Sequence, residues 1–235
     1  MYSLTTIMLA LAATASSSKL HVSSYTGTIT TFNLTNAANK TWQLTPIASD
    51  IHSSPNASYL TIDAAHKNVF CLDENIIGSN GSINSYQLDP ASGGLINPSR
   101  LPTLAAPVHS AIYTGPNGSQ LLIVAHYAHA ITTYTIAKDT GIFTPHESLN
   151  FTLPKPGPDP QQKTALPHQI LIDPLNKYAV VPDLGGDLVR VFAIDATTLK
   201  LTERVPLNVA PGSGPRHGAF VKQAENATFY YWSRS

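Results

Sequence analysis

The chain has 235 residues with 14 basic and 14 acidic side chains, so it can form one large domain with a hydrophobic core and carries no formal net charge. This balance excludes the basic surface that binding to nucleic acid or to an anionic membrane requires. Charged residues are only 12% of the chain, and its 18 prolines and 14 glycines are typical of an all-β protein with many short loops.

The first 15 residues predict a secretory signal peptide, residues 1–15. Ile7–Ala13 is a short apolar core, and Ala13-Thr14-Ala15 is a cleavage site of the small-x-small type. The segment before this core has no Lys or Arg, so a buried first strand is the alternative, although the Ser- and Ala-rich flanks favour a signal. Residues 16–235 would then form a secreted, extracellular domain. No later segment approaches the about 20 consecutive apolar residues of a membrane-spanning helix.

Seven asparagines lie in N-glycosylation sequons, in which Asn is followed by any residue except proline and then by Ser or Thr. A single sequon arises by chance in a chain rich in these residues, but seven favour an extracellular glycoprotein. The predicted glycosylation sites are Asn33, Asn39, Asn56, Asn80, Asn117, Asn150 and Asn226.

A turn followed by an alternating strand occurs four times, at residues 26–34, 80–88, 128–136 and 186–194. Short apolar runs interrupted by Pro, Asn, Asp and Gly indicate strands rather than helices. Four short strands in every ~40–50 residues are the pattern of a β-propeller, whose sheets bury their faces against their neighbours. The sequence therefore predicts an all-β propeller with about four to five blades in this chain. A β-sandwich is the alternative, but it does not require the internal repeat.

Three strands begin with a proline and a histidine close together, at Pro107-Val108-His109, Pro167-His168 and Pro215-Arg216-His217. A long Pro-rich loop, residues 153–164, leads to the second of these starts. Loops of this length inside a compact domain are often functional. We interpret His109 and His217 as residues that line a channel or pack between blades.

Two segments resemble the lactonase family of propellers, which includes propeller-type 6-phosphogluconolactonase and the fungal 3-carboxy-cis,cis-muconate lactonizing enzyme. They are Leu166–Gly185 and Gly214–His217, and the loop Gly157–Gln162 resembles the family's loop before the histidine. The resemblance is strong from about Gly157 to Phe220 and weak before it, from His21. It implies a seven-bladed propeller of which this chain, at ~50 residues per blade, supports four blades and part of a fifth. We therefore expect an incomplete propeller domain, truncated or divergent at its C-terminal end.

The resemblance implies that His168 and Arg216 face the mouth of the channel. An imidazole, with an unperturbed pKa of about 6.5, can move the proton that lactone opening requires, so His168 is the candidate general acid and base. A guanidinium binds carboxylate or phosphate through two parallel hydrogen bonds, so Arg216 is the candidate anchor for the acid group. His217 and Gln169 are the candidate substrate-binding residues. The alternative is structural: His168 caps its loop, and Arg216 pairs with an acid between blades.

The implied substrate is a small acidic lactone that the enzyme opens, as 6-phosphogluconolactonase does. Ring formation from an unsaturated diacid, as in a carboxymuconate cyclase, is the reverse case. A non-catalytic secreted propeller with a binding role is the alternative function. The family's glutamate after Tyr230-Tyr231 and its later arginine are absent from this chain. The absent glutamate and the dense sequons favour that alternative.

Neither a metal nor a cofactor is predicted. His126 and His129 have a spacing that suits a helix, but in a strand an offset of three places two side chains on opposite faces. The chain has no phosphate-binding loop and no nucleophile elbow. Asp183 and Asp187 flank a Gly-Gly turn and are predicted to bond local backbone groups. Cys71 is the sole cysteine and lies in an apolar run, so we expect a buried thiol.

Overall fold

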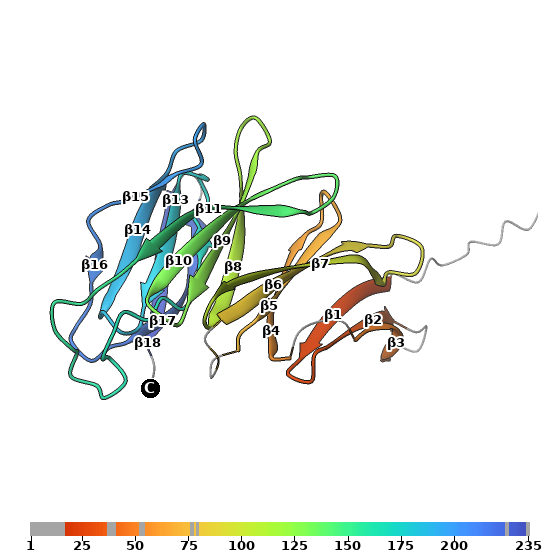
Figure 1. Ribbon diagram of the computed structural model, residues 1–235, viewed down its shortest axis with the longest axis horizontal. Helices are drawn as coiled ribbons and strands as arrows, with labels where there is room; N and C mark the ends of the chain where they lie inside the picture. The colour runs from red at the N-terminus through yellow and green to blue at the C-terminus, as the bar shows by residue number, and fades with distance from the viewer. Residues whose placement is uncertain are drawn as a thin grey trace, which may run out of the picture.

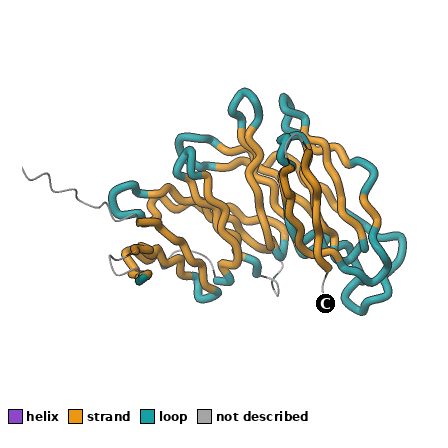
Figure 2. The backbone as a smooth tube through the Cα atoms, turned by 180° about the vertical axis from the view of Figure 1, so that it is seen from behind, coloured by secondary structure: helices purple, strands orange, loops and turns teal. Residues whose placement is uncertain are grey.

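The structure is a computed structural model that describes residues 17–36, 41–51, 55–75, 78, 80–223 and 226–233. Every regular element in these residues is a β-strand, as Figure 2 shows, and none is a helix that could span a membrane. The predicted signal peptide and the sequon residue Asn39 lie outside the described residues.

The strands form five antiparallel sheets that follow one another along the chain, from the red to the blue end of the colour scale in Figure 1. The first sheet contains β1 (Ser17–Ser24), β2 (Thr28–Asn36) and β3 (Trp42–Asp50). The second contains β4 (Ala57–Asp63), β5 (Asn68–Asp73), β6 (Asn80–Leu88) and β7 (Leu95–Leu104). The third contains β8 (Pro107–Thr114), β9 (Gln120–His126), β10 (Ala130–Ile136) and β11 (Phe143–Asn150).

The last two sheets lie in the C-terminal part of the chain. The fourth contains β12 (Leu171–Ile172), β13 (Tyr178–Asp183), β14 (Leu188–Ile194) and β15 (Leu201–Glu203), and β16 (Leu207–Asn208) also pairs with β14. The fifth contains β17 (Pro215–Gln223) and β18 (Asn226–Ser233). The four predicted repeats coincide with β2, the second strand of the first sheet, and with β6, β10 and β14, each the third strand of its sheet in chain order.

Neighbouring sheets meet along their first strands. The strand β1 lies beside β4, β4 beside β8, and β8 beside β12, while β17 lies beside β13. The later strands of each sheet extend outward from this line, which is the arrangement of blades in a β-propeller. The predicted all-β propeller with four to five blades is thus confirmed, and the starts of the first strands are brought together near one axis.

The hydrophobic core consists of separate clusters between adjacent blades, and β9 contributes side chains to two of them. Leu121 and Ile123 face the cluster shared with the fourth sheet, whereas Leu122 and Val124 face the cluster shared with the second. All four side chains are fully buried, because alternate residues of a strand point to opposite faces and both faces are covered. Burial of each contributes about 1.5–3 kcal/mol.

Between the first two sheets, Cys71 packs with Val69 in a third cluster and is fully buried, as predicted. Burial raises the pKa of its thiol to about 12, so the sulfur is protonated and unreactive at neutral pH. The cysteine therefore acts as a small apolar residue.

Candidate active site

The first strands of neighbouring blades begin with an equivalent backbone irregularity. The register shifts by one residue near the start of β4, β8 and β17, at Ala57/Tyr59, Pro107/His109 and Pro215/His217. In the fourth sheet, Pro167 pairs with Asp183 immediately before His168 and Gln169. A bulge of this kind re-aims side chains and is common beside active sites. The three proline-histidine starts in the sequence thus occupy corresponding places in three blades.

Three imidazoles meet where these strands begin. The rings of His168 and His217 lie edge to face, with their centroids 4.9 Å apart. The Nδ1 atom of His109 accepts a hydrogen bond of 3.3 Å from the backbone N–H of Ile170. His109 is buried, whereas His168 and His217 are partly open to solvent. The third, fourth and fifth blades therefore each contribute one histidine to a single cluster.

Two tyrosines pack against this cluster. The ring of Tyr59, from β4, lies 4.1 Å from the ring of His109, and the ring of Tyr127 lies edge-on 5.6 Å from that of His168. Tyr127 belongs to the turn between β9 and β10. No sequence motif indicated these tyrosines, although Tyr59 follows Ala57 as His109 follows Pro107. Comparison of the repeats at the start of each blade could have found it.

Arg216 supplies the positive charge of the cluster. Its side chain is exposed, and the described residues contain no acidic partner for it. The ion pair between blades that was the alternative for Arg216 is therefore not observed in the described part of the chain. Gln169 joins the fourth and fifth blades, because its Oε1 accepts a 2.7 Å hydrogen bond from the N–H of Gly218.

All three imidazoles are neutral at pH 7. Burial, and next the charge of Arg216, lower the pKa of His168 to about 3. Burial also lowers the pKa of His109 to about 3, and burial with Arg216 lowers that of His217. The pKa of His168 in the free protein therefore lies well below the unperturbed value of about 6.5 that the sequence argument used. Its Nδ1 is buried and has no hydrogen-bond partner among the described residues.

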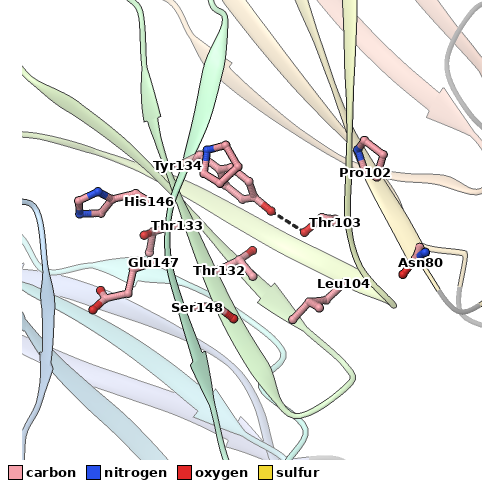
Figure 3. Close-up of a pocket in the computed structure, with 11 residues that line it drawn as sticks. Asn80, Pro102, Thr103, Leu104, Thr132, Thr133, Tyr134, His146, Glu147 and Ser148 are labelled. Atoms are coloured by element: carbon pink, nitrogen blue, oxygen red, sulfur yellow. Dashed lines mark hydrogen bonds between the residues drawn. The ribbon is translucent and has the colours of Figure 1, made fainter.

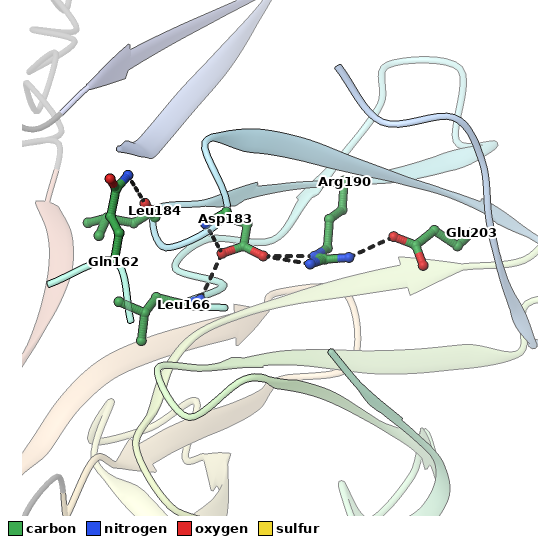
Figure 4. Close-up of polar contacts among 7 residues, drawn as sticks. Gln162, Leu166, Asp183, Leu184, Arg190 and Glu203 are labelled. Atoms are coloured by element: carbon green, nitrogen blue, oxygen red, sulfur yellow. Dashed lines mark hydrogen bonds and ion pairs between the residues drawn. The ribbon is translucent and has the colours of Figure 1, made fainter. Parts of the chain in front are cut away.

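A buried ion pair supports the backbone that leads to His168 (Figure 4). One carboxylate oxygen of Asp183 accepts a 2.7 Å hydrogen bond from the N–H of Leu166, two residues before His168. The other oxygen lies 2.9 Å from both Nε and Nη2 of Arg190. Arg190 also contacts Glu203 at 2.8 Å and stacks on the ring of Phe151. These contacts hold the backbone immediately before His168 in place.

Asp187 links the loops that precede the two candidate residues. It accepts hydrogen bonds from the Gln162 amide at 2.6 Å and from the N–H groups of Gly212 and Gly214 at 2.7 and 2.9 Å. Gln162 precedes His168, and Gly214 precedes Arg216. Both aspartates of the Gly-Gly turn thus bond backbone groups, but only Asp183 bonds a local one, the N–H of Gly186, whereas the backbone partners of Asp187 lie in a remote loop.

The family model for the lactonase, seven-bladed β-propeller matches residues 19–233 of the chain. The chain belongs to the lactonase family of seven-bladed β-propellers. The match covers the strands that hold the histidine cluster, so the resemblance of residues 157–220 to this family extends over nearly all of the described chain.

Curated relatives of this lactonase-family chain carry the names of sugar lactonases. The "Probable 6-phosphogluconolactonase" of Arthroderma benhamiae is 37% identical over 112 residues, which are 47% of this chain and 28% of the relative. The 6-phosphogluconolactonase of Formosa agariphila is 26% identical over 183 residues, 74% of this chain and 50% of the relative. The chain thus spans half or less of the length of these relatives.

Solved structures agree on the fold. A Bacteroides fragilis protein superposes with a TM-score of 0.72 over 96% of this chain and 63% of its own, at 24% identity. The periplasmic gluconolactonase of Pseudomonas aeruginosa superposes with a TM-score of 0.68 at 25% identity, over 82% of this chain and 54% of its own. The lactonase propeller architecture is therefore shared across these proteins.

The histidines that were weighed as metal ligands lie in different surroundings. His126 ends β9 and is fully buried, whereas His129 is exposed in the following turn with a positive φ of 57°. His129 therefore lies in a turn, and not in a strand as the sequence pattern predicted. In the described part of the chain no group of three or more His, Cys, Asp or Glu side chains could hold a metal ion.

The predicted glycosylation sites differ in exposure. Asn80, Asn117 and Asn150 are exposed, and Asn33 and Asn56 are half-buried. The backbone of Asn226 begins β18, but its side chain is outside the described part. Glycosylation of these residues stays a prediction.

Proposed function

We propose that this lactonase-family propeller is part of a lactone hydrolase that opens small acidic lactones at the cluster of His168, His217 and Arg216. The observation that carries the proposal is an exposed guanidinium without an acidic partner in the described chain, next to neutral imidazoles. The names of the curated relatives support a sugar lactone as the substrate and favour ring opening over ring formation.

In this proposal Arg216 binds the phosphate or carboxylate of the substrate through charge-assisted hydrogen bonds. Gln169 keeps its amide N–H groups for substrate hydroxyls, because its oxygen is already bonded to Gly218. His217, whose ring touches that of His168, lines the same space. The lactone ring then lies against the imidazole of His168.

His168 acts as the general base and then as the general acid. Its neutral imidazole takes a proton from a water molecule as the water oxygen bonds to the lactone carbonyl carbon. The ring C–O bond breaks, and the proton passes to the departing ring oxygen, so that one water is consumed and a hydroxy acid is formed. A substrate anion offsets the charge of Arg216, which raises the pKa of His168 above about 3 and makes it a stronger base.

We further propose that the protein is a secreted glycoprotein, on the support of the apolar segment Ile7–Ala13 and the seven sequons. Outside the cell a phosphorylated sugar is not the expected substrate, so the acid group of the lactone can be a carboxylate as well as a phosphate. The substrate class is therefore an acidic lactone of sugar size.

Hydrolysis of 6-phosphogluconolactone and of the uncharged glucono-lactone, followed by proton release in weak buffer, tests the proposal. Arg216→Ala should lower kcat/KM for the charged lactone by about 10²-fold, with a much smaller effect on the uncharged one. His168→Gln should lower kcat for both by about 10²–10⁴-fold. Arg204→Ala, which removes an exposed charge beyond β15, is the matched control and should leave both rates unchanged.

Turnover that is the same in wild type and in His168→Gln would place the reaction elsewhere or show that it is not enzymatic. Equal losses for the two lactones in Arg216→Ala would refute the anchoring role of the arginine, while leaving the role of His168 intact.

A further inference from the structure

A groove of about 520 Å³ separates the second and third blades, and none of the residues that line it belongs to the histidine cluster. It lies between β7 on one side and β10 and β11 on the other (Figure 3). Its volume is within the ~300–1,000 Å³ that is usual for small-molecule sites. Both blades have neighbours on each side in the structure, so the groove does not depend on an uncovered sheet face.

Hydroxyl groups face this groove from both blades. Tyr134 of β10 reaches across to Thr103 of β7, and their oxygens are 2.5 Å apart. Figure 3 shows Thr132 and Ser148 on the side that faces Leu104. Each hydroxyl can both donate and accept hydrogen bonds. The groove therefore offers polar partners from three strands.

Among the residues that the structure describes, no charged side chain points into the groove. Figure 3 shows the carboxylate of Glu147 turned away from Leu104 and Thr103, toward the fourth sheet. There its Oε2 accepts a 3.1 Å hydrogen bond from the N–H of Leu201. A charged ligand would therefore lose its hydration without gaining an opposite charge, which is costly.

The buried His126 determines the polarity of Thr132. Its Nδ1 lies 3.1 Å from the carbonyl oxygen of Ala105, which can only accept, so Nδ1 carries the hydrogen. Burial lowers the pKa of His126 to about 4, so Nε2 is unprotonated at pH 7 and accepts the hydrogen of the Thr132 hydroxyl at 2.8 Å. The Thr132 oxygen consequently offers only lone pairs to the groove. A ligand must present a donor there, such as an O–H group, and an anion meets only another acceptor.

Apolar surface lies beside these hydroxyls. Leu104 is 39% exposed, and Pro102 and Pro145, both exposed, complete the lining. Such a surface suits the C–H face of a saturated ring, while its edge hydroxyls bond to the polar groups. The combination selects a ring with many hydroxyls and no charge.

We propose that this groove binds a neutral sugar ring. The sugar can be free, or it can be carried by the chain itself, because Asn80 lies at the groove and begins the sequon Asn80-Gly81-Ser82. Asn80 is exposed and pairs with Leu104 across the β6–β7 ladder. The same groups of the groove would therefore bind either a free sugar or a glycan attached to Asn80. The proposal does not depend on lactone hydrolysis.

Free sugar is tested on the full chain made in a host that adds no glycans. Saturation-transfer NMR would measure the binding of glucose and N-acetylglucosamine, with gluconate as the charged comparison. Neutral sugars should bind at millimolar Kd, at least tenfold more tightly than gluconate. Tyr134→Phe should weaken their binding at least tenfold, and so should Ser148→Ala, which changes an exposed residue. Tyr86→Phe makes the same change at the corresponding position of the preceding repeat and should have no effect.

An attached sugar is tested on the chain made in a host that does add glycans. A nuclear Overhauser effect between the first glycan residue and Leu104 would support the proposal for a sugar attached to Asn80. The Asn80→Gln variant should abolish this signal. The proposal is overturned if neither free nor attached sugar contacts the groove. It is equally overturned if gluconate binds as well as glucose, or if binding survives both Tyr134→Phe and Ser148→Ala.

Discussion

Mild acid should destabilise this propeller well above the pH at which carboxylates are protonated. His109 and His126 are buried as neutral imidazoles, with pKa values lowered to about 3 and about 4. In the unfolded chain each has a pKa near ~6.5. Because the folded pKa is depressed, the stabilisation is fully present above pH ~6.5 and is lost as the pH falls toward the folded values. Between pH 7.5 and 5.5 only the unfolded state gains these protons.

The size of this loss of stability follows from the difference in proton binding between the unfolded and the folded state. From pH 7.5 to 5.5 each such histidine lowers the free energy of unfolding by about 1.4 kcal/mol, so the two buried rings together cost about 3 kcal/mol. The half-buried His168 adds less than another full contribution, because solvent screens it. A loss of this size is a large part of the about 5–15 kcal/mol by which domains are stable.

Urea denaturation at pH 7.5, 6.5 and 5.5 would measure this loss. His126→Gln should reduce the pH-dependent loss by about 1.4 kcal/mol. Ile123→Val, a fully buried change in the same strand, should lower stability by about 0.5–1.5 kcal/mol equally at each pH, since it removes no titratable group. A free energy of unfolding that is the same at pH 7.5 and 5.5 would refute the reasoning.

Three further outcomes are expected. Arg190→Leu leaves the carboxylate of Asp183 buried without its partner and should lower the free energy of unfolding by about 3–5 kcal/mol, measured by urea denaturation. Gly185→Ala places a Cβ atom against the carbonyl oxygen of Thr164 and should cost at least about 1–3 kcal/mol, visible as a lower Tm, whereas an unchanged Tm would contradict the close approach. Cys71 should resist a disulfide reagent in the native protein and react in denaturant, and fast native labelling would disprove its burial.

The fold was largely predictable, because the apolar and polar pattern of each strand indicates which of its faces are buried. Residues 121–125 of the strand Gln120–His126 form an uninterrupted apolar run, and a strand with that pattern must be covered on both faces. The repeat of such strands at ~50-residue intervals then implies that each blade covers its neighbours. Strand bounds and the extra pairing of β16 with β14 depend on local contacts that no periodicity encodes.

The candidate site was predictable only in part. The repeated proline-histidine pattern identified His168 and His217, and the cluster brings them together. Tyr59 was missed although it occupies the place of His109 in its own blade, because that blade begins with Ala57 and not with a proline-histidine pattern. Tyr127 was missed, because its contact arises from the packing of separate blades and no spacing along the chain records it. The depressed pKa of His168 was missed for the same reason, since burial and the nearness of Arg216 are properties of the folded state.

His168 and Arg216, the proposed base and the proposed anchor, occupy equivalent positions in adjacent blades. Each follows the proline that begins the first strand of its blade, and Val108 occupies the same place in the blade before. Adjacent blades present equivalent positions around one axis, so residues 48 apart in sequence become neighbours. The hydrogen bond from the N–H of Gly218 to the side chain of Gln169 joins the two blades beside these positions. The nearness of the proposed base to the proposed anion anchor therefore depends on the packing of these two blades.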